Sequence, residues 1–209
     1  MKKPKIILIG AGGHAHACID IVERQGIYDI AGLVGLRNEI NKQCLVYSVI
    51  ASDDDLAELI NRYQYACIAV GRIQSADLST HIFQKLTKLG FILPSIISPN
   101  AYVSNYASIG KGSLVMHGAI INAGSKIGDN CIINTRAIIE HDVIIESHCH
   151  ISTGAILNGN VHVGKKSFIG SGSIVKEGIL IGESCLVGMG LSLRHNLEDN
   201  IKFIGSKKA

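Results

Sequence analysis

The sequence has no tryptophan, only three prolines among its 209 residues, and an aromatic content of 5%. Hydrophobic residues make up 47% and charged residues 18%, a balance that excludes a wholly disordered chain. The formal net charge of +3 is too small to argue for nucleic acid as a partner. No hydrophobic run approaches the ~18 residues of a membrane span, and the N-terminal run is too short for a signal peptide. We therefore expect a cytoplasmic protein without membrane insertion.

The six cysteines include no CxxC pair. Neither a disulfide framework nor a zinc site is indicated, so we expect no metal. Glycine, in contrast, is abundant, with 23 residues against an average share of about 7%. A core of Ile, Val, Leu and Ala with many glycines and few rings indicates a repetitive, closely packed backbone.

A six-residue period organises residues 97–193. Its seventeen aliphatic positions are all Ile, Val or Leu, from Ile97 and Val103 to Val187 and Leu193. The residue four places later is usually Ala, Ser or Cys. A period of six fits neither a helix nor a simple strand. It is typical of a chain that runs straight briefly, turns a corner and repeats, with the aliphatic and the small residue pointing inward. The sequence predicts a hexapeptide β-helix of between five and six three-sided coils.

Two residue types have a clear place in this repeat. Cys131, Cys149 and Cys185 occupy the small inward position, where we expect them to act as small hydrophobic residues. Glycine often follows the aliphatic residue, as at Gly110 and Gly170. We expect these glycines to relieve backbone strain at the corners.

The first half of the chain alternates strands and helices. Expected strands cover residues 5–9, 30–34, 66–70 and 91–93, and expected helices cover 16–25, 53–63 and 75–89. This order predicts a small Rossmann-like parallel sheet with helices on both faces. We divide the chain into an α/β domain at residues 1–95 and a β-helix at residues 96–209.

The loop Gly10–Ala15 follows the first strand and matches G-x-G-x-x-A. Glycines let the backbone approach a phosphate at a helix N-terminus, where free N–H groups favour anions. A dinucleotide site also needs an acidic residue after the second strand, and none occurs there before Glu39. Because this half is also short, we favour a nucleotide diphosphate over NAD. The alternative is a glycine-rich turn without a ligand.

Three of the nine histidines, His141, His148 and His150, lie within ten residues. In the six-residue register, His141 and His150 should project outward, to water or to another prism. Asp142 follows His141, and a histidine beside a carboxylate suits general-base chemistry. Zinc held by the three histidines is an alternative, but successive hexapeptides occupy different faces, so His141 and His148 should diverge. Exposed histidines without a function are the other alternative.

The glycine-rich unit, the hexapeptide array and Ile139-Glu140-His141-Asp142 with a histidine nine places after His141 resemble the PglD/NeuD-type bacterial sugar acyltransferases. The resemblance covers nearly the whole chain. It implies a left-handed β-helix and a homotrimer with acetyl-CoA in the groove between neighbouring subunits. The implied activity is acetyl-CoA-dependent N-acetylation of a UDP-linked 4-amino sugar for surface-glycan synthesis, by direct attack on the thioester.

The resemblance also implies roles for individual residues. His141 would be the catalytic base and Asp142 its carboxylate partner. Residues expected along acetyl-CoA are Asn134, His150, Gly159, Gly170, Ser171, Gly188 and Met189. Residues expected to bind the nucleotide sugar are Gly12, Gly13, His14, Gly71 and Arg72. Gly35-Leu36 departs from the family, in which many members carry acidic residues there that contact the nucleotide, so this chain either reads the base differently or takes another acceptor.

Three further functions fit the same residues. Within the enzyme class, the alternative is O-acetylation of a sialic-acid-like sugar. A non-catalytic β-helix that supports a sialic-acid-type synthesis enzyme is the second alternative. The third is a zinc β-helix similar to γ-carbonic anhydrases, which stoichiometric zinc would reveal.

Overall fold

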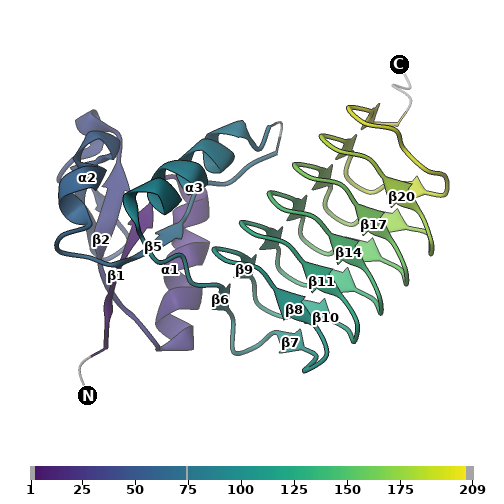
Figure 1. Ribbon diagram of the computed structural model, residues 1–209, viewed down its shortest axis with the longest axis horizontal. Coiled ribbons are helices and arrows are strands. Elements are labelled where there is room, and N and C mark those ends of the chain that lie inside the picture. The colour runs from purple at the N-terminus through teal and green to yellow at the C-terminus, as the bar shows by residue number, and fades with distance from the viewer. Residues whose placement is uncertain (1–2, 74, 206–209) are drawn as a thin grey trace.

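The computed structural model describes residues 3–73 and 75–205. An N-terminal α/β unit is followed by a three-sided β-helix, whose coils lead away from that unit toward the C-terminus (Figure 1). The β-helix that the repeat pattern predicts is therefore confirmed.

The sheet of the α/β unit has the order β3-β4-β2-β1-β5. Its parallel strands are β1 (Lys5–Ile9), β2 (Asp29–Gly35), β4 (Tyr47–Ser52) and β5 (Tyr65–Ile68), and β3 (Gln43–Cys44) pairs antiparallel with β4. The strands expected at 5–9, 30–34 and 66–70 are confirmed within two residues at their ends. The β3–β4 hairpin was not expected. The strand expected at 91–93 is wrong, because only a single bridge joins Ile92 to Tyr65.

Helices cover both faces of this sheet. Helix α1 (Gly13–Gln25) begins three residues before the expected position, and α3 (Asp77–Leu89) ends at Gly90, which has a φ of +90°. The helix expected at 53–63 is shorter: the 3₁₀ turn η2 (Asp53–Asp55) leads into α2 (Leu56–Leu59). After α2 the chain continues as a tighter 3₁₀-like turn, because the N–H groups of Asn61 and Arg62 donate to carbonyls only three residues earlier. A second 3₁₀ turn, η1 (Arg37–Glu39), follows β2.

The β-helix consists of three parallel sheets. Sheet I contains β6 (Ile96–Ile97), β9 (Leu114–Val115), β12 (Ile132–Ile133), β15 (His150–Ile151), β18 (Phe168–Ile169), β21 (Leu186–Val187) and β23 (Lys202–Phe203). Sheet II contains β7 (Tyr102–Val103), β10 (Ile120–Ile121), β13 (Ile138–Ile139), β16 (Ile156–Leu157), β19 (Ile174–Val175) and β22 (Ser192–Leu193). Sheet III contains β8 (Ser108–Ile109), β11 (Lys126–Ile127), β14 (Ile144–Ile145), β17 (His162–Val163) and β20 (Leu180–Ile181).

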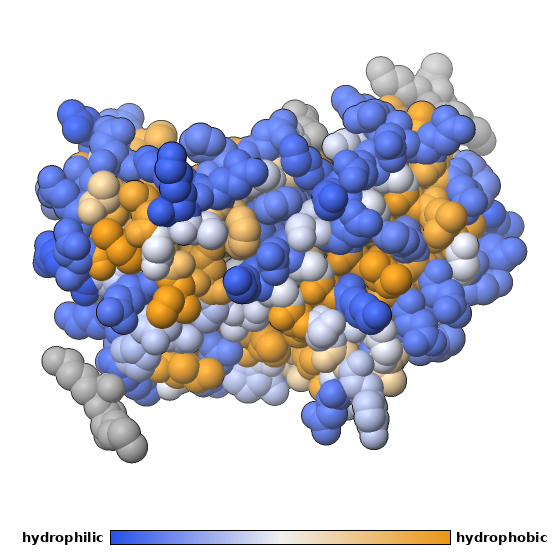
Figure 2. Space-filling view, in the orientation of Figure 1, coloured by the Kyte–Doolittle hydropathy of each residue, from blue (hydrophilic) through white to orange (hydrophobic). Residues whose placement is uncertain are grey.

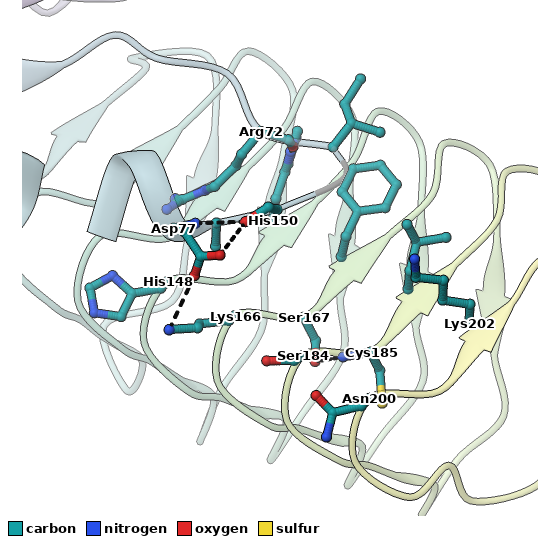
Figure 3. A pocket seen from close by; sticks show the side chains of 15 residues that line it. Arg72, Asp77, His148, His150, Lys166, Ser167, Ser184, Cys185, Asn200 and Lys202 are labelled. Carbon is teal, nitrogen blue, oxygen red and sulfur yellow. Dashed lines mark hydrogen bonds and ion pairs between the residues drawn. The ribbon is translucent and has the colours of Figure 1, made fainter. Parts of the chain in front are cut away.

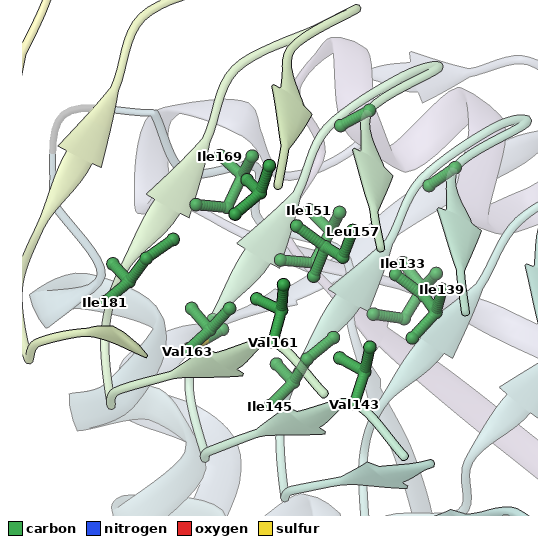
Figure 4. Packing of buried hydrophobic residues seen from close by; sticks show 14 of the residues in the cluster. Ile133, Ile139, Val143, Ile145, Ile151, Leu157, Val161, Val163, Ile169 and Ile181 are labelled. Atoms are coloured by element: carbon green, nitrogen blue, oxygen red, sulfur yellow. The ribbon is translucent and has the colours of Figure 1, made fainter. Parts of the chain in front are cut away.

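Residues eighteen apart stack on one another inside the prism. Ile121 pairs with Ile139, which pairs with Leu157 in the next coil. These side chains belong to one buried cluster that fills the prism (Figure 4). Cys131, Cys149 and Cys185 are buried in the same cluster, which confirms the small inward position.

A left-handed backbone recurs at every sixth residue from 112 to 190. Glycines occupy half of these corners, at 112, 118, 124, 154, 172, 178 and 190. Asn130, Arg136, Asp142, His148, Asn160, Lys166 and Ser184 occupy the others. The glycines after the aliphatic residue are a different set, and their expected role is wrong. At Gly170, a Cβ would lie 2.5 Å from the Met189 backbone nitrogen, so glycine is needed there for the close approach of two coils.

The α/β unit packs on the lower coils through sheet I. Helix α1 residues Cys18 and Ile19 share a buried cluster with Ile96, Leu114 and Ile132 of that sheet. Asp20 Oδ2 lies 2.6 Å from His117 Nε2 across the same interface. Hydrophobic patches are scattered among polar residues over both parts (Figure 2). Within residues 3–73 and 75–205, no helix has the length and apolar character needed to cross a membrane.

Candidate active site

His141 and Asp142 form a dyad at the corner between β13 and β14. His141 Nδ1 lies 3.0 Å from Asp142 Oδ2, and the two side chains are 60% and 59% exposed. Asp142 has a φ of +59°, so its carboxylate turns back toward the ring of its neighbour. Glu140 is not part of the dyad, because its Oε2 accepts from Asn122 Nδ2 at 3.0 Å. The corner therefore presents an outward imidazole with a carboxylate on one nitrogen.

Two glycines in adjacent coils make room for the dyad. A Cβ on Gly159 would lie 2.5 Å from His141 Nε2, and a Cβ on Gly124 would lie 2.2 Å from Asp142 Oδ1. Gly159 is one of the residues expected beside acetyl-CoA, and the structure places it directly against the His141 ring. The absence of a side chain at Gly159 thus leaves room for the His141 ring to pack beside the next coil.

A second corner gathers five of the residues expected along acetyl-CoA. Asn134, Ser152, Gly170 and Gly188 are spaced by eighteen and therefore stack on the corner between sheets I and II. Ser152 Oγ and Ser171 Oγ lie 2.9 Å apart, and the Met189 side chain is 80% exposed. This corner offers backbone and small side chains over several coils, as an extended ligand requires.

The dyad and the second corner lie at opposite edges of sheet II. Asn134 precedes β13 and His141 follows it. Between them, sheet II presents an outward column of isoleucines at 120, 138, 156 and 174, each paired with the next. One chain alone does not bring His141 onto the Asn134 corner.

The expected position of His150 needs correction. The ring projects outward from the prism, but it is only 6% exposed because the loop after β5 of the same chain covers it. Its Nδ1 lies 2.6 Å from the Arg72 carbonyl oxygen, its Nε2 lies 3.1 Å from Asn134 Nδ2, and the Phe168 ring packs edge-on at 5.1 Å. Burial lowers the pKa of His150 to about 4. The ring is therefore a neutral group that is largely covered by its own chain and hydrogen-bonded to Asn134.

A pocket of ≈ 480 Å³ lies at the carboxyl ends of β1, β2 and β5. Gly12, Gly13, His14 and Gly71, all expected to bind the nucleotide sugar, line it together. Helix α1 begins there without a side-chain cap, so its first N–H groups are free for an anion. Burial, with Arg72 nearby, lowers the pKa of His14. The pocket has the place and size of a nucleotide site.

Two carboxylates of this pocket were missed by sequence reasoning. The structure brings Glu39 back to the end of β2, where its Oε2 accepts from the Leu36 N–H at 2.8 Å. Asp53, at the end of β4, also lines the pocket, and burial raises its pKa. The end of β4 lies beside that of β2 because the two strands pair in parallel, with Gly35 opposite Ser52. An acidic side wall therefore exists although Gly35-Leu36 carries no acid.

Arg72 does not line that pocket. It borders a second pocket of ≈ 290 Å³ between the loop after β5 and sheet I, together with His148, His150, Lys166 and Phe168 (Figure 3). Lys166 Nζ lies 3.3 Å from Asp77 Oδ1 at its edge. Burial lowers the pKa of His148. Among the residues that the structure describes, no group of three or more His, Cys, Asp or Glu side chains is arranged to hold a metal ion.

Comparison with known families finds matches to separate segments of the chain. Residues 5–76 match the PglD N-terminal domain. Residues 106–140 and 124–159 match the bacterial transferase hexapeptide (six repeats), and residues 160–194 match the hexapeptide repeat of succinyl-transferase. Comparison with curated protein sequences finds no match.

Solved structures give close matches over nearly the full length. Perosamine N-acetyltransferase from Caulobacter crescentus, in a variant with one histidine replaced by asparagine and in complex with CoA and GDP-perosamine, is 32% identical over 96% of this chain and 93% of that one, with a TM-score of 0.90. The acetyltransferase domain of PglB from Neisseria gonorrhoeae, in complex with acetyl coenzyme A, is 32% identical over 96% and 95%, with a TM-score of 0.88. WeeI from Acinetobacter baumannii AYE, at 20% identity and a TM-score of 0.77, shares the fold. The chain therefore belongs to the PglD-type family of hexapeptide-repeat sugar acetyltransferases.

Proposed function

We propose that this protein transfers the acetyl group of acetyl-CoA to the amine of a nucleotide-linked amino sugar. The observation that carries the proposal is the exposed dyad, in which the Asp142 carboxylate lies 3.0 Å from His141 Nδ1. A carboxylate only accepts hydrogen bonds, so it favours a proton on Nδ1 and a free lone pair on Nε2. The relatives in complex with CoA, acetyl-CoA and GDP-perosamine support the choice of both substrates.

The reaction needs no covalent enzyme intermediate. The acceptor nitrogen attacks the thioester carbonyl, and His141 Nε2 takes the proton that this nitrogen loses. The new C–N bond remains when the C–S bond breaks, and the leaving CoA thiolate receives the proton from His141. Asp142 stabilises the imidazolium between the two transfers. Support for a histidine in this role comes from the perosamine N-acetyltransferase, of which two solved variants replace one histidine by asparagine or alanine.

The pocket at the end of β1 suits the nucleotide. Its glycines and the start of α1 would hold the diphosphate, with the base toward Glu39 and Asp53 and the sugar toward Gly71. The family resemblance favours a UDP-linked 4-amino sugar for surface-glycan synthesis, whereas the solved perosamine enzyme binds GDP-perosamine. Both nucleotides therefore belong in the acceptor panel.

A homotrimer would complete the site. His141 and the Asn134 corner lie at opposite edges of sheet II, so a neighbouring subunit is needed to bring one beside the other. The isoleucine column of sheet II, with Ile174 43% exposed, supports this face as the contact. Sedimentation analysis of the full chain and of Ile156→Glu tests the trimer. A monomeric parent protein would contradict it.

The activity test measures CoA thiol release with acetyl-CoA and a panel of GDP- and UDP-linked 4-amino sugars, each matched to its 4-hydroxy counterpart. We expect release only with an amine. Activity restricted to hydroxyl sugars would contradict N-acetylation and favour the O-acetyltransferase. Absence of any turnover, with the protein folded and acetyl-CoA bound, would favour the accessory β-helix.

A further inference from the structure

Arg72 is a buried guanidinium whose terminal nitrogens contact only uncharged groups. The residue is 6% exposed, and the ion pairs among the described residues do not include it. One terminal nitrogen donates to Ser79 Oγ at 2.7 Å and the other to the Asn130 carbonyl oxygen of the β-helix. Its Nε has no partner. Burying an arginine without a carboxylate is costly, so this residue needs an explanation.

The backbone of the same residue reaches His150. The Arg72 carbonyl oxygen lies 2.6 Å from His150 Nδ1, and a carbonyl oxygen only accepts, so Nδ1 must carry the proton. His150 Nε2 is then an acceptor, and Asn134 Nδ2 donates to it at 3.1 Å. The Thr135 N–H donates to Asn134 Oδ1 at 2.7 Å, which fixes the orientation of the amide. Asn134 keeps one further N–H for a ligand.

A series of contacts connects the nucleotide pocket to His150. Gly71 lines the nucleotide pocket, and the next residue is anchored by its side chain in the unit interface and by its carbonyl on His150. Arg72, in the loop after β5, lies beside His150 of sheet I (Figure 3). Burial is the largest cause of the lowered pKa of His150, and the charge of nearby Arg72 acts in the same direction.

We propose that Arg72 is a positioning residue: its guanidinium, anchored on Ser79 and Asn130, holds the loop carbonyl on His150, and His150 thereby aims the free Asn134 N–H at the acyl donor. This inference rests on the proposed function for its catalytic consequence. The fixed tautomer of His150, in contrast, is a property of the protein without substrates.

The first measurement is ¹⁵N NMR of the imidazoles in the substrate-free protein, for the parent, Arg72→Met and Arg72→Lys. A control, Asp20→Asn, removes a different contact of the same interface, to His117. We expect a single Nδ1–H tautomer of His150 in the parent and in Asp20→Asn. In Arg72→Met we expect a mixture of tautomers and titration of His150 closer to the ordinary value of about 6.5. An unchanged His150 signal in Arg72→Met would overturn the proposal.

The second measurement is transfer kinetics on the same proteins. Loosening the aim of one hydrogen bond should lower kcat between about tenfold and 10²-fold in Arg72→Met, with the dissociation constant of the nucleoside diphosphate unchanged within about twofold. An equal loss in Asp20→Asn would show that Arg72 only joins the two units. If Arg72→Met does not fold, both measurements use Ser79→Ala instead, which removes one hydrogen-bond partner of the guanidinium. If the parent has no transferase activity, the NMR result still decides the positioning claim.

Discussion

His141 Nδ1 lies 3.0 Å from Asp142 Oδ2 on a corner where both side chains are more than half exposed. Replacing His141 by Gln should therefore lower kcat by about 10²–10⁴-fold, as expected for loss of a general base. Thiol release at saturating acetyl-CoA measures this effect. Asp142→Asn should cause a smaller loss, because the base remains but its tautomer is no longer fixed.

Neither substitution should unfold the protein, because the dyad contributes nothing to the buried cluster of the prism. Thermal unfolding of both variants gives the control. A drop in activity that follows a drop in melting temperature would assign the dyad a structural role instead.

Gly159→Ala and Gly170→Ala should separate activity from stability. A Cβ on Gly159 meets only the exposed His141 ring, whereas a Cβ on Gly170 meets the backbone of Gly188 and Met189. We expect Gly159→Ala to displace the ring and lower kcat up to about 10²-fold, with little change in melting temperature. Gly170→Ala should cost about 1–3 kcal/mol of stability. If one of the two variants showed the larger loss in both kcat and melting temperature, the two glycines would not have the separate roles argued above.

The buried His150 should make folding stability depend on pH. Burial lowers its pKa to about 4, against an ordinary value of about 6.5. Between these values the unfolded chain binds a proton that the folded chain does not, so stability rises with pH. The contribution is fully present above about pH 6.5 and is lost as the pH falls toward 4, by roughly 3 kcal/mol.

Urea unfolding of the parent and of His150→Gln between about pH 4.5 and 7.5 measures this difference. His14 and His148, whose pKa values burial also lowers, act in the same direction in both proteins. The parent should therefore lose more stability than the variant on acidification. Parallel curves would show that His150 titrates as it does in the unfolded chain.

Arg136→Gly should stabilise the β-helix. Arg136 is an exposed corner residue with a φ of +56°. A non-glycine residue pays roughly 1–2 kcal/mol for this conformation, and glycine loses roughly 0.5–1 kcal/mol in chain entropy. The net gain should be up to about 1.5 kcal/mol, visible as a higher melting temperature. Arg136→Val should lower the melting temperature, and a gain with valine would refute the argument.

The β-helix was predictable because the sequence pattern that specifies it is local and is repeated in every coil. Each coil specifies its own inward residue, and seventeen aliphatic positions in one register leave no competing period. The dyad was predictable for the same reason, because adjacent residues at a corner need no long-range contact to meet.

The parts that sequence reasoning missed depend on contacts between distant segments. The burial of His150 requires the loop at Arg72, 78 residues earlier in the chain. Asp53 reaches the pocket that Glu39 lines because β4 pairs in parallel with β2. The hairpin that leads into β4 was not expected because its Leu45 corner, with a φ of +55°, carries none of the usual turn residues. The spacing of residues along the sequence does not show which distant segments meet in the folded chain.

The regular recurrence of the corner residue limits how this chain can change in length. Deleting eighteen residues would remove one complete coil of the β-helix and leave every later side chain on the same side of the prism. Deleting six would rotate the remainder by one side of the triangle and carry Gly188 away from the edge that it shares with Asn134. Natural or engineered variants of this β-helix should therefore differ in length by whole coils of eighteen residues, with loops inserted only at outward-facing corners.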